Sequence, residues 1–141
     1  MNIAILTKEY PPHIYGGAGA HVEHLTRELE KLDGGAHEVQ ILCFGDQDEK
    51  SGKKLVRGIQ LPAAVQVYDE RHRTLVDALE RNGAMVGILQ QADVIHCHTW
   101  YTHLAGCLLR EMLGAPLLLT THSLELQRPW KREQLGTAYQ A

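Results

Sequence analysis

Two short apolar runs in this sequence end in side chains that can do chemistry. Each run is typical of a buried parallel strand, and ligands of open α/β sheets bind beyond the carboxyl ends of such strands. We therefore predict that the polar residues at the two ends line one cleft and contact substrate. The first run, residues 93–100, ends in His98, Thr99 and Trp100. The second run, residues 117–123, ends in His122 and Ser123.

His122 is the predicted catalytic residue. It closes the apolar run that starts at Leu117, so the strand-end rule places it at the mouth of the cleft. A neutral imidazole there can donate or accept one directed hydrogen bond and titrates near neutral pH. Residue type and position alone leave open the alternative that His122 caps a following helix.

A glycine-rich loop, residues 15–19, lies between an apolar run at residues 2–7 and an amphipathic stretch. Small residues let backbone N–H groups approach an anion, and the dipole of the following helix adds partial positive charge. We predict that Tyr15, Gly16 and Gly17 contact a phosphate. The spacing differs from G-x-G-x-x-G, so a tight turn without a ligand stays open. Asp46 lies in a charged loop past the next strand and is not expected to bind a ribose.

His96 and His98 form an H-x-H pair with metal-ligand spacing. On a strand both imidazoles point to one face and Cys97 to the other. A metal-dependent hydrolase is one alternative function, but it needs a third ligand, and Asp93 stands at the wrong end of the strand. We expect one histidine packed in the sheet, one at its rim, and neither metal nor cofactor. Three other residues with metal-ligand spacing are expected to form a solvated helix face: His21, His24 and Glu28.

The N-terminal third of the chain predicts the fold class. Residues 2–7 have the pattern of a buried strand, residues 18–32 that of an amphipathic helix ended by Gly34-Gly35, and residues 39–44 that of a second strand. Strand, helix and strand in this order are the βαβ unit of a parallel sheet. We therefore expect an α/β, Rossmann-like parallel sheet with helices on both faces.

The rest of the chain continues the same alternation. Residues 45–58 are charged and glycine-rich, which indicates an exposed loop or hairpin. A helical stretch follows with a kink at Asn82-Gly83, and a second helix carries an apolar stripe and ends at Gly114 before a strand at 117–121. Short strands are expected at 59–61 and 65–67, and the apolar stripe consists of Leu104, Leu108 and Met112.

Composition excludes several functional classes. The chain has 141 residues, enough for one domain, and 14 basic against 17 acidic residues give a net charge of −3. No basic stripe suggests nucleic acid, and no leader-like or membrane-spanning run is present, so we expect a cytoplasmic protein. Cys43, Cys97 and Cys107 are odd in number and lie in apolar patterns, which predicts reduced core thiols of low reactivity.

The same motifs resemble the N-terminal half of bacterial glycogen synthases. The similarity is greater to the glycosyltransferase family 4 branch, which includes the α-maltose-1-phosphate synthases, and it runs almost the whole length of the chain. The residues that carry it are Thr7-Lys8-Glu9-Tyr10-Pro11-Pro12, Tyr15-Gly16-Gly17-Ala18-Gly19-Ala20-His21, Asp93 to Tyr101, Thr121-His122-Ser123-Leu124-Glu125, and Arg128 to Gly136.

This resemblance implies the GT-B architecture, in which two Rossmann-like domains face each other across a cleft. It also implies transfer of glucose, with retention of configuration, from ADP-glucose or UDP-glucose to an α-1,4-glucan or glucose 1-phosphate. Residues 1–141 then form a single, incomplete, acceptor-side N-terminal domain. Most of the nucleotide pocket belongs to the other domain, so we expect the isolated chain to be inactive.

The resemblance also assigns roles to individual residues. Gly16 and Gly17 match the loop that approaches the donor phosphates, and His122 matches the histidine that contacts the donor sugar. Thr99 and Trp100 match an Asp-Trp pair of glycogen synthases. Two positions differ from the family pattern. The typical loop reads Lys-x-Gly-Gly where this chain has Ile14-Tyr15-Gly16-Gly17, and Thr99 replaces the aspartate.

A second function class stays open. The chain could be a noncatalytic α/β module that binds a sugar or a sugar phosphate. The isolated chain could also self-associate through surfaces that a missing part would cover. A continuation of the gene into a second Rossmann-like domain would favour the enzyme.

Overall fold

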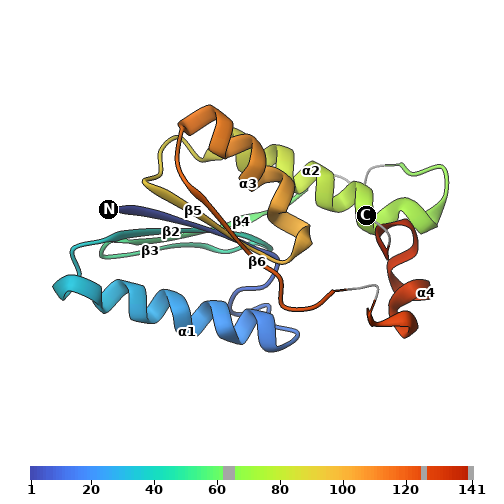
Figure 1. Ribbon diagram of the computed structural model, residues 1–141, viewed down its shortest axis with the longest axis horizontal. Helices are drawn as coiled ribbons and strands as arrows, with labels where there is room; N and C mark the ends of the chain where they lie inside the picture. The colour runs from blue at the N-terminus through green and yellow to red at the C-terminus, as the bar shows by residue number, and fades with distance from the viewer. Residues whose placement is uncertain (62–65, 125–126, 140–141) are drawn as a thin grey trace.

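The computed structural model describes residues 1–61, 66–124 and 127–139. Its strands and helices alternate along the chain except at β2, β3 and β4, which follow one another (Figure 1). They are β1 (Asn2–Thr7), α1 (Gly17–Lys31), β2 (Glu38–Phe44), β3 (Asp48–Ser51), β4 (Lys54–Ile59), α2 (Arg73–Ile88), β5 (Val94–His98), α3 (Trp100–Leu113), β6 (Leu117–Thr120) and α4 (Arg132–Leu135), with short 3₁₀ turns η1 (Leu32–Gly34), η2 (Glu70–His72), η4 (Pro129–Lys131) and η5 (Gly136–Tyr139).

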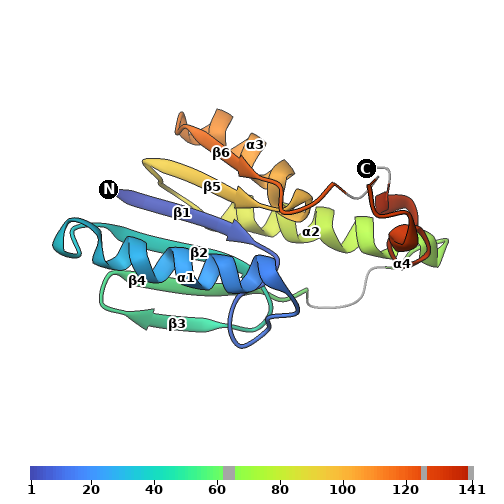
Figure 2. The ribbon, with the colours of Figure 1, turned by 60° about the horizontal axis from the view of Figure 1, so that its bottom comes forward.

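The strands form one sheet in the order β3-β4-β2-β1-β5-β6. All neighbouring strands are parallel except β3, which runs antiparallel to β4. Figure 2 shows the sheet between α1 on one face and α2 with α3 on the other. The predicted α/β class, with a parallel sheet and helices on both faces, is confirmed.

Each face of the sheet has its own apolar core. Under α1, Val22 packs against Ile5 and Ile41. Under α2 and α3, Met85 and Leu109 pack against the opposite side of the same strands. Because successive residues of a strand point to opposite faces, strands covered on both sides read as near-continuous apolar runs. This is why the predicted strands at 2–7 and 39–44 agree with β1 and β2.

The region 45–58 is more ordered than its composition indicated. It contains the predicted hairpin, but its second arm, β4, is a strand of the main sheet paired with β2. Val56 of β4 is buried, while Lys54 forms an ion pair of 2.9 Å with Glu30 of α1. The charged residues thus lie at the margin of the sheet. The short strand expected at 59–61 is only the end of β4, and the one expected at 65–67 lies partly outside the described residues.

The predicted apolar stripe of α3 was wrong in its direction. Leu104, Leu108 and Met112 are 44%, 45% and 64% exposed, and the helix instead buries a face that includes Ala105 and Gly106. A Cβ on Gly106 would lie 2.4 Å from the sulfur of Cys97, so the helix approaches β5 through its small residues. The leucines consequently point outward, as does Cys107, which is not the core thiol that we expected.

The predicted kink in α2 is also absent, because Asn82 lies inside a continuous helix and is buried. Its amide nitrogen donates to the carbonyl oxygen of Tyr101 at 2.6 Å, and its amide oxygen accepts from the N–H of Ala105 at 2.7 Å. Asn82 thereby inserts between a donor and an acceptor of α3. The side chain joins the two helices on this face of the sheet.

This insertion predicts opposite effects at two adjacent positions. Asn82→Ala should lower the free energy of unfolding by about 2 kcal/mol, because buried polar groups of α3 lose their partner. Gly83→Ala should raise it by about 0.5–1 kcal/mol, because Gly83 is exposed within a helix and a Cβ there meets nothing within 4 Å. Urea unfolding of both variants is the measurement. A destabilised Gly83→Ala variant would indicate that α2 is kinked there after all.

Candidate functional site

The candidate site lies where the direction of the chain connections reverses. From β1 the chain proceeds through α1 to β2 on one side, whereas β5 and β6 lie on the other side of β1 and are connected through α3. A crevice forms outside the carboxyl ends of the strands at such a reversal. A cavity of about 770 Å³ occupies this position. Among the predicted site residues, it is lined by Tyr15, Gly16, Thr99, Trp100, His122 and Ser123.

Two predicted residues stand apart from this lining. His98 is fully buried beneath the cavity, where it contacts His122 rather than open space. Gly17 is the first residue of α1 and does not line the cavity. The structure therefore brings the two predicted strand ends and the glycine loop together, but His98 reaches a ligand only through another side chain.

The glycine loop is open toward the cavity. A Cβ on Gly16 or Gly17 would meet nothing within 4 Å, and neither residue has a positive φ. At Gly19, by contrast, a Cβ would lie 2.9 Å from the Glu9 side chain. The close packing of the turn thus accounts for Gly19 only. Space for a ligand against the backbone accounts better for Gly16, which lines the cavity.

Glu9 already occupies part of this loop. One of its carboxylate oxygens accepts hydrogen bonds from the N–H groups of Tyr15 and Gly16, each at 3.0 Å. The loop amides are thus engaged by an anion of the protein itself. The first-turn N–H groups of α1 have no partner within the helix, and such groups are the ones that bind phosphates in other proteins.

Three cationic side chains line the same cavity, and the sequence analysis gave none of them a role. Lys8 directly follows β1, and its ammonium lies 4.1 Å from the centre of the Tyr101 ring. Arg128 donates to the hydroxyl of Ser123 at 3.2 Å, and Lys131 lies on the following 3₁₀ turn. Among the described lining residues, three cations against the carboxylate of Glu9 make the cavity attractive to an anionic ligand. The strand-end rule could have identified Lys8, whereas no local pattern places the other two here.

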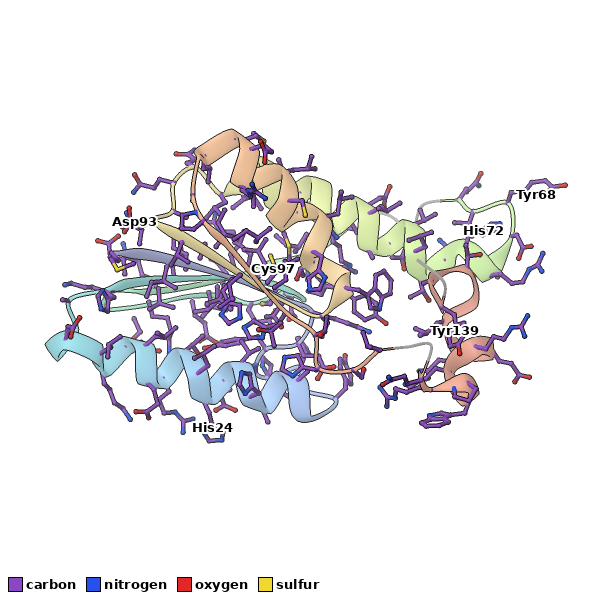
Figure 3. All side chains as sticks on the ribbon, viewed as in Figure 1. His24, Tyr68, His72, Asp93, Cys97 and Tyr139 are labelled. Carbon is purple, nitrogen blue, oxygen red and sulfur yellow. The ribbon has the colours of Figure 1, made fainter. Side chains whose placement is uncertain are left out.

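Four imidazoles meet beside the cavity. The rings of His96 and His98 lie 4.0 Å apart, as expected for an i, i+2 pair on one strand face, and Cys97 points into the opposite core (Figure 3). The ring of His21 lies 5.6 Å from His98 and 5.2 Å from His122. His21 therefore contacts this cluster, although its side chain is exposed as expected for the solvated face of α1. His24 does point outward from α1 in Figure 3.

Hydrogen bonds engage the two histidines of the H-x-H pair. His96 Nε2 lies 2.7 Å from the hydroxyl of Thr120, and His98 Nδ1 lies 3.1 Å from Nε2 of His122. Within residues 1–61, 66–124 and 127–139, no group of three or more His, Cys, Asp or Glu side chains is arranged to hold a metal ion. Asp93 lies at the far end of β5, where it accepts from the N–H of Asn2 (Figure 3).

Burial favours the uncharged form of His96, His98 and His122. It lowers the pKa of His98 to about 3, with a smaller effect from the neighbouring imidazoles, and it lowers the pKa of His96 and of His122 in the same direction. At neutral pH these side chains are therefore neutral donors and acceptors of hydrogen bonds. The positive charge around the cavity comes from the lysines and the arginine instead.

Thr99 has a strained backbone at the edge of the cavity. Its φ of 66° and ψ of 158° fall in a region that is essentially restricted to glycine, and a β-branched side chain is especially unfavourable there. Strain of this kind concentrates at functional sites. The conformation thus adds support for the predicted substrate contact at Thr99.

The comparisons with known proteins agree with this geometry. Ligands of open α/β sheets bind in the crevice where the strand order reverses, and the cavity of this chain occupies that position. The model of Glycosyltransferase Family 4 matches residues 15–141, and the chain belongs to this family.

Individual proteins are similar to this chain in sequence. The chain is 42% identical to alpha-maltose-1-phosphate synthase of Mycolicibacterium smegmatis, over 99% of the chain and 33% of that protein. It is 29% identical to glycogen synthase of Mycobacterium tuberculosis, over 91% of the chain and 35% of that protein. The chain therefore spans about a third of the length of these relatives.

A solved structure shows the same fold. Sucrose-phosphate synthase from Thermosynechococcus elongatus superposes with a TM-score of 0.62 at 19% sequence identity, over 94% of this chain and 36% of that one. The predicted resemblance to glycogen synthases and maltose-1-phosphate synthases is confirmed. So is the expectation that the chain derives from a glycosyltransferase with the GT-B fold.

The strain at Thr99 predicts that glycine at this position stabilises the fold. Thr99→Gly should raise the free energy of unfolding by about 1 kcal/mol, because glycine adopts this backbone conformation without the side-chain clash. Thr74→Gly is the control, since Thr74 lies in the first turn of α2 and should lose about 0.5–1 kcal/mol. Chemical denaturation measures both. Equal losses in the two variants would show that Thr99 is unstrained.

The buried imidazole of His98 predicts a loss of stability in acid. The unfolded chain binds a proton below pH 6.5, whereas folded His98 does so only near pH 3. Its contribution is therefore complete above pH 6.5 and declines as the pH falls, by about 2 kcal/mol at pH 5. His98→Asn should reduce the decline in unfolding free energy between pH 7 and pH 5, and a His24→Asn variant on the exposed face of α1 should not. A decline that His98→Asn leaves unchanged would contradict the assignment.

Proposed function

We propose that this chain is the acceptor-side, N-terminal domain of a retaining glucosyltransferase. In this proposal the whole enzyme transfers glucose from ADP-glucose or UDP-glucose to glucose 1-phosphate or to an α-1,4-glucan. One observation carries the proposal: His122, the open glycine loop and three cations converge on one cavity at the reversal point of a family 4 fold. Both donors carry a diphosphate that such a cavity attracts.

The side chains support distinct tasks in this reaction. Lys8, Arg128 and Lys131 lower the energy of the negative charge on the departing diphosphate, and the N–H groups at the start of α1 act in the same sense. His122, being neutral, donates or accepts a hydrogen bond to a sugar hydroxyl near the reacting carbon. The exposed ring of Tyr15 and the indole of Trp100 offer flat surfaces to a sugar ring.

A second cavity supports a site for the acceptor. It has a volume of about 560 Å³ and shares Lys8 and Tyr15 with the first cavity, so ligands in the two would be neighbours. Arg81 lines it, with its guanidinium 5.0 Å above the Phe44 ring. Asp46 lines it too and pairs with His13 at 2.6 Å. This mixed charge suits a polar, sugar-sized molecule.

The proposal includes a cytoplasmic location and self-association of the isolated chain. In the described part of the chain, no helix is long and apolar enough to cross a bilayer. The proposed substrates are cytoplasmic metabolites, which supports a cytoplasmic protein. The outward leucines of α3, together with Leu118 and Leu119 of the edge strand β6, form an exposed apolar margin, and this supports self-association of the isolated chain.

A chimeric enzyme tests the proposal. Residues 1–141 would replace the matching third of the Mycolicibacterium smegmatis relative, and transfer from labelled ADP-glucose and UDP-glucose to glucose 1-phosphate and to glycogen would be measured. The chimera should form product, and the isolated chain should form none. His122→Ala in the chimera should lower kcat by about a hundredfold, the usual effect of losing one preorganised polar contact.

Two outcomes would contradict this account. A chimera that folds and binds donor without transferring glucose would favour the noncatalytic binding module. Near-normal kcat in the His122→Ala chimera would show that the site depends on another residue. A His24→Ala chimera is the matched control, because His24 is an exposed histidine that points away from the cavity.

A further inference from the structure

One residue of the histidine cluster has no direct access to the cavity and yet contacts the residue that we propose acts there. His98 ends β5, is fully buried, and places Nδ1 at 3.1 Å from Nε2 of His122. His122 lines the cavity and is bonded through this nitrogen to His98. A ligand in the cavity can therefore use only the other ring nitrogen of His122, Nδ1.

The surroundings of His98 determine which way this hydrogen bond runs. Its second nitrogen, Nε2, is buried without a hydrogen-bond partner among the described residues. A neutral imidazole carries one N–H, so a proton on Nε2 would leave a buried donor unsatisfied. Buried N–H groups are rarely left unpaired, whereas unpaired acceptors are better tolerated. The proton of His98 is therefore more stable on Nδ1, where it has a partner.

We propose that His98 is a positioning residue that donates from Nδ1 to Nε2 of His122 and thereby holds His122 in its Nδ1–H form. His122 then presents an N–H, and not a lone pair, to the cavity. An N–H can donate to a sugar hydroxyl or to a phosphate oxygen. The consequence for catalysis depends on the proposed glucosyltransferase function, but the tautomer itself does not.

The groups around the pair are compatible with two neutral rings. His21 of α1 and His96 of β5 lie next to them, and His103 of α3 also influences the pKa of His98. Glu9 is the one carboxylate that influences His122 among the described residues. Burial lowers the pKa of both His98 and His122, so both rings remain neutral at neutral pH, where each has a single proton to place.

Nitrogen-15 NMR of the 141-residue chain, without substrate, tests the proposal. Two-bond proton–nitrogen correlations distinguish the Nδ1–H from the Nε2–H form of each histidine, and loss of signals in His122→Gln assigns those of His122. Wild-type His122 should be in the Nδ1–H form. In His98→Phe, which keeps the ring but removes the donor, the ratio of the two forms should shift toward Nε2–H by about tenfold, as expected for the loss of one hydrogen bond.

Two further variants separate this role from a merely structural one. His98→Asn retains an N–H donor near the Nδ1 position and should preserve the Nδ1–H form of His122. His96→Phe alters the ring that lies tilted against His98 and is hydrogen-bonded to Thr120 rather than to His122, and it should leave the ratio unchanged. An Nε2–H form in the wild type would overturn the proposal, as would an unchanged ratio in folded His98→Phe. If His98→Phe does not fold, the wild-type form and the His98→Asn spectrum decide the question.

Discussion

The structure depends on the reversal of strand order between β1 and β5. The connection after β1 runs over one face of the sheet through α1, whereas the connection after β5 runs over the other face through α3. The two connections diverge, and this leaves a crevice at the carboxyl ends of β1 and β5. The opening is where the glycine loop, Thr99 and His122 meet. Features that are costly elsewhere, such as a strained threonine and the buried imidazole of His98, gather at this one place.

Local pattern sufficed to predict the elements that are covered on both sides. β1 and β2 are apolar almost throughout, and α1 has a polar face against solvent, so pattern and packing agree. Prediction was wrong where packing overrode the pattern. The leucine stripe of α3 has the correct helical spacing, but Gly106 allows the opposite face to approach β5, and only the sheet reveals this choice. Likewise, the sequence predicted a kink in α2 at Asn82. The structure has hydrogen bonds from Asn82 to α3 instead, and these partners lie far from Asn82 in the sequence.

The site was predictable as far as the strand-end rule extends. Thr99 follows β5 directly, His122 and Ser123 come shortly after β6, and all three line the cavity at the strand ends. Arg128 and Lys131 reach the cavity because the chain after β6 folds back, with Leu135 buried and the hydroxyl of Thr137 2.6 Å from His72. No local pattern predicts such a return. The contact between His21 and the strand histidines is equally invisible in sequence, because it joins α1 to the sheet across the layer.

The central claim is that one cavity at the carboxyl ends of β1, β5 and β6 binds the substrates. Titration of the nitrogen-15-labelled chain with ADP-glucose, UDP-glucose or glucose 1-phosphate tests this claim most directly, because every backbone amide reports on nearby binding. The account predicts saturable shifts at Tyr15, Gly16, Thr99 and Ser123, with none at the opposite end of the sheet near Asn2 and Asp93. Shifts that are confined to that opposite end, or spread uniformly without saturation, would contradict it.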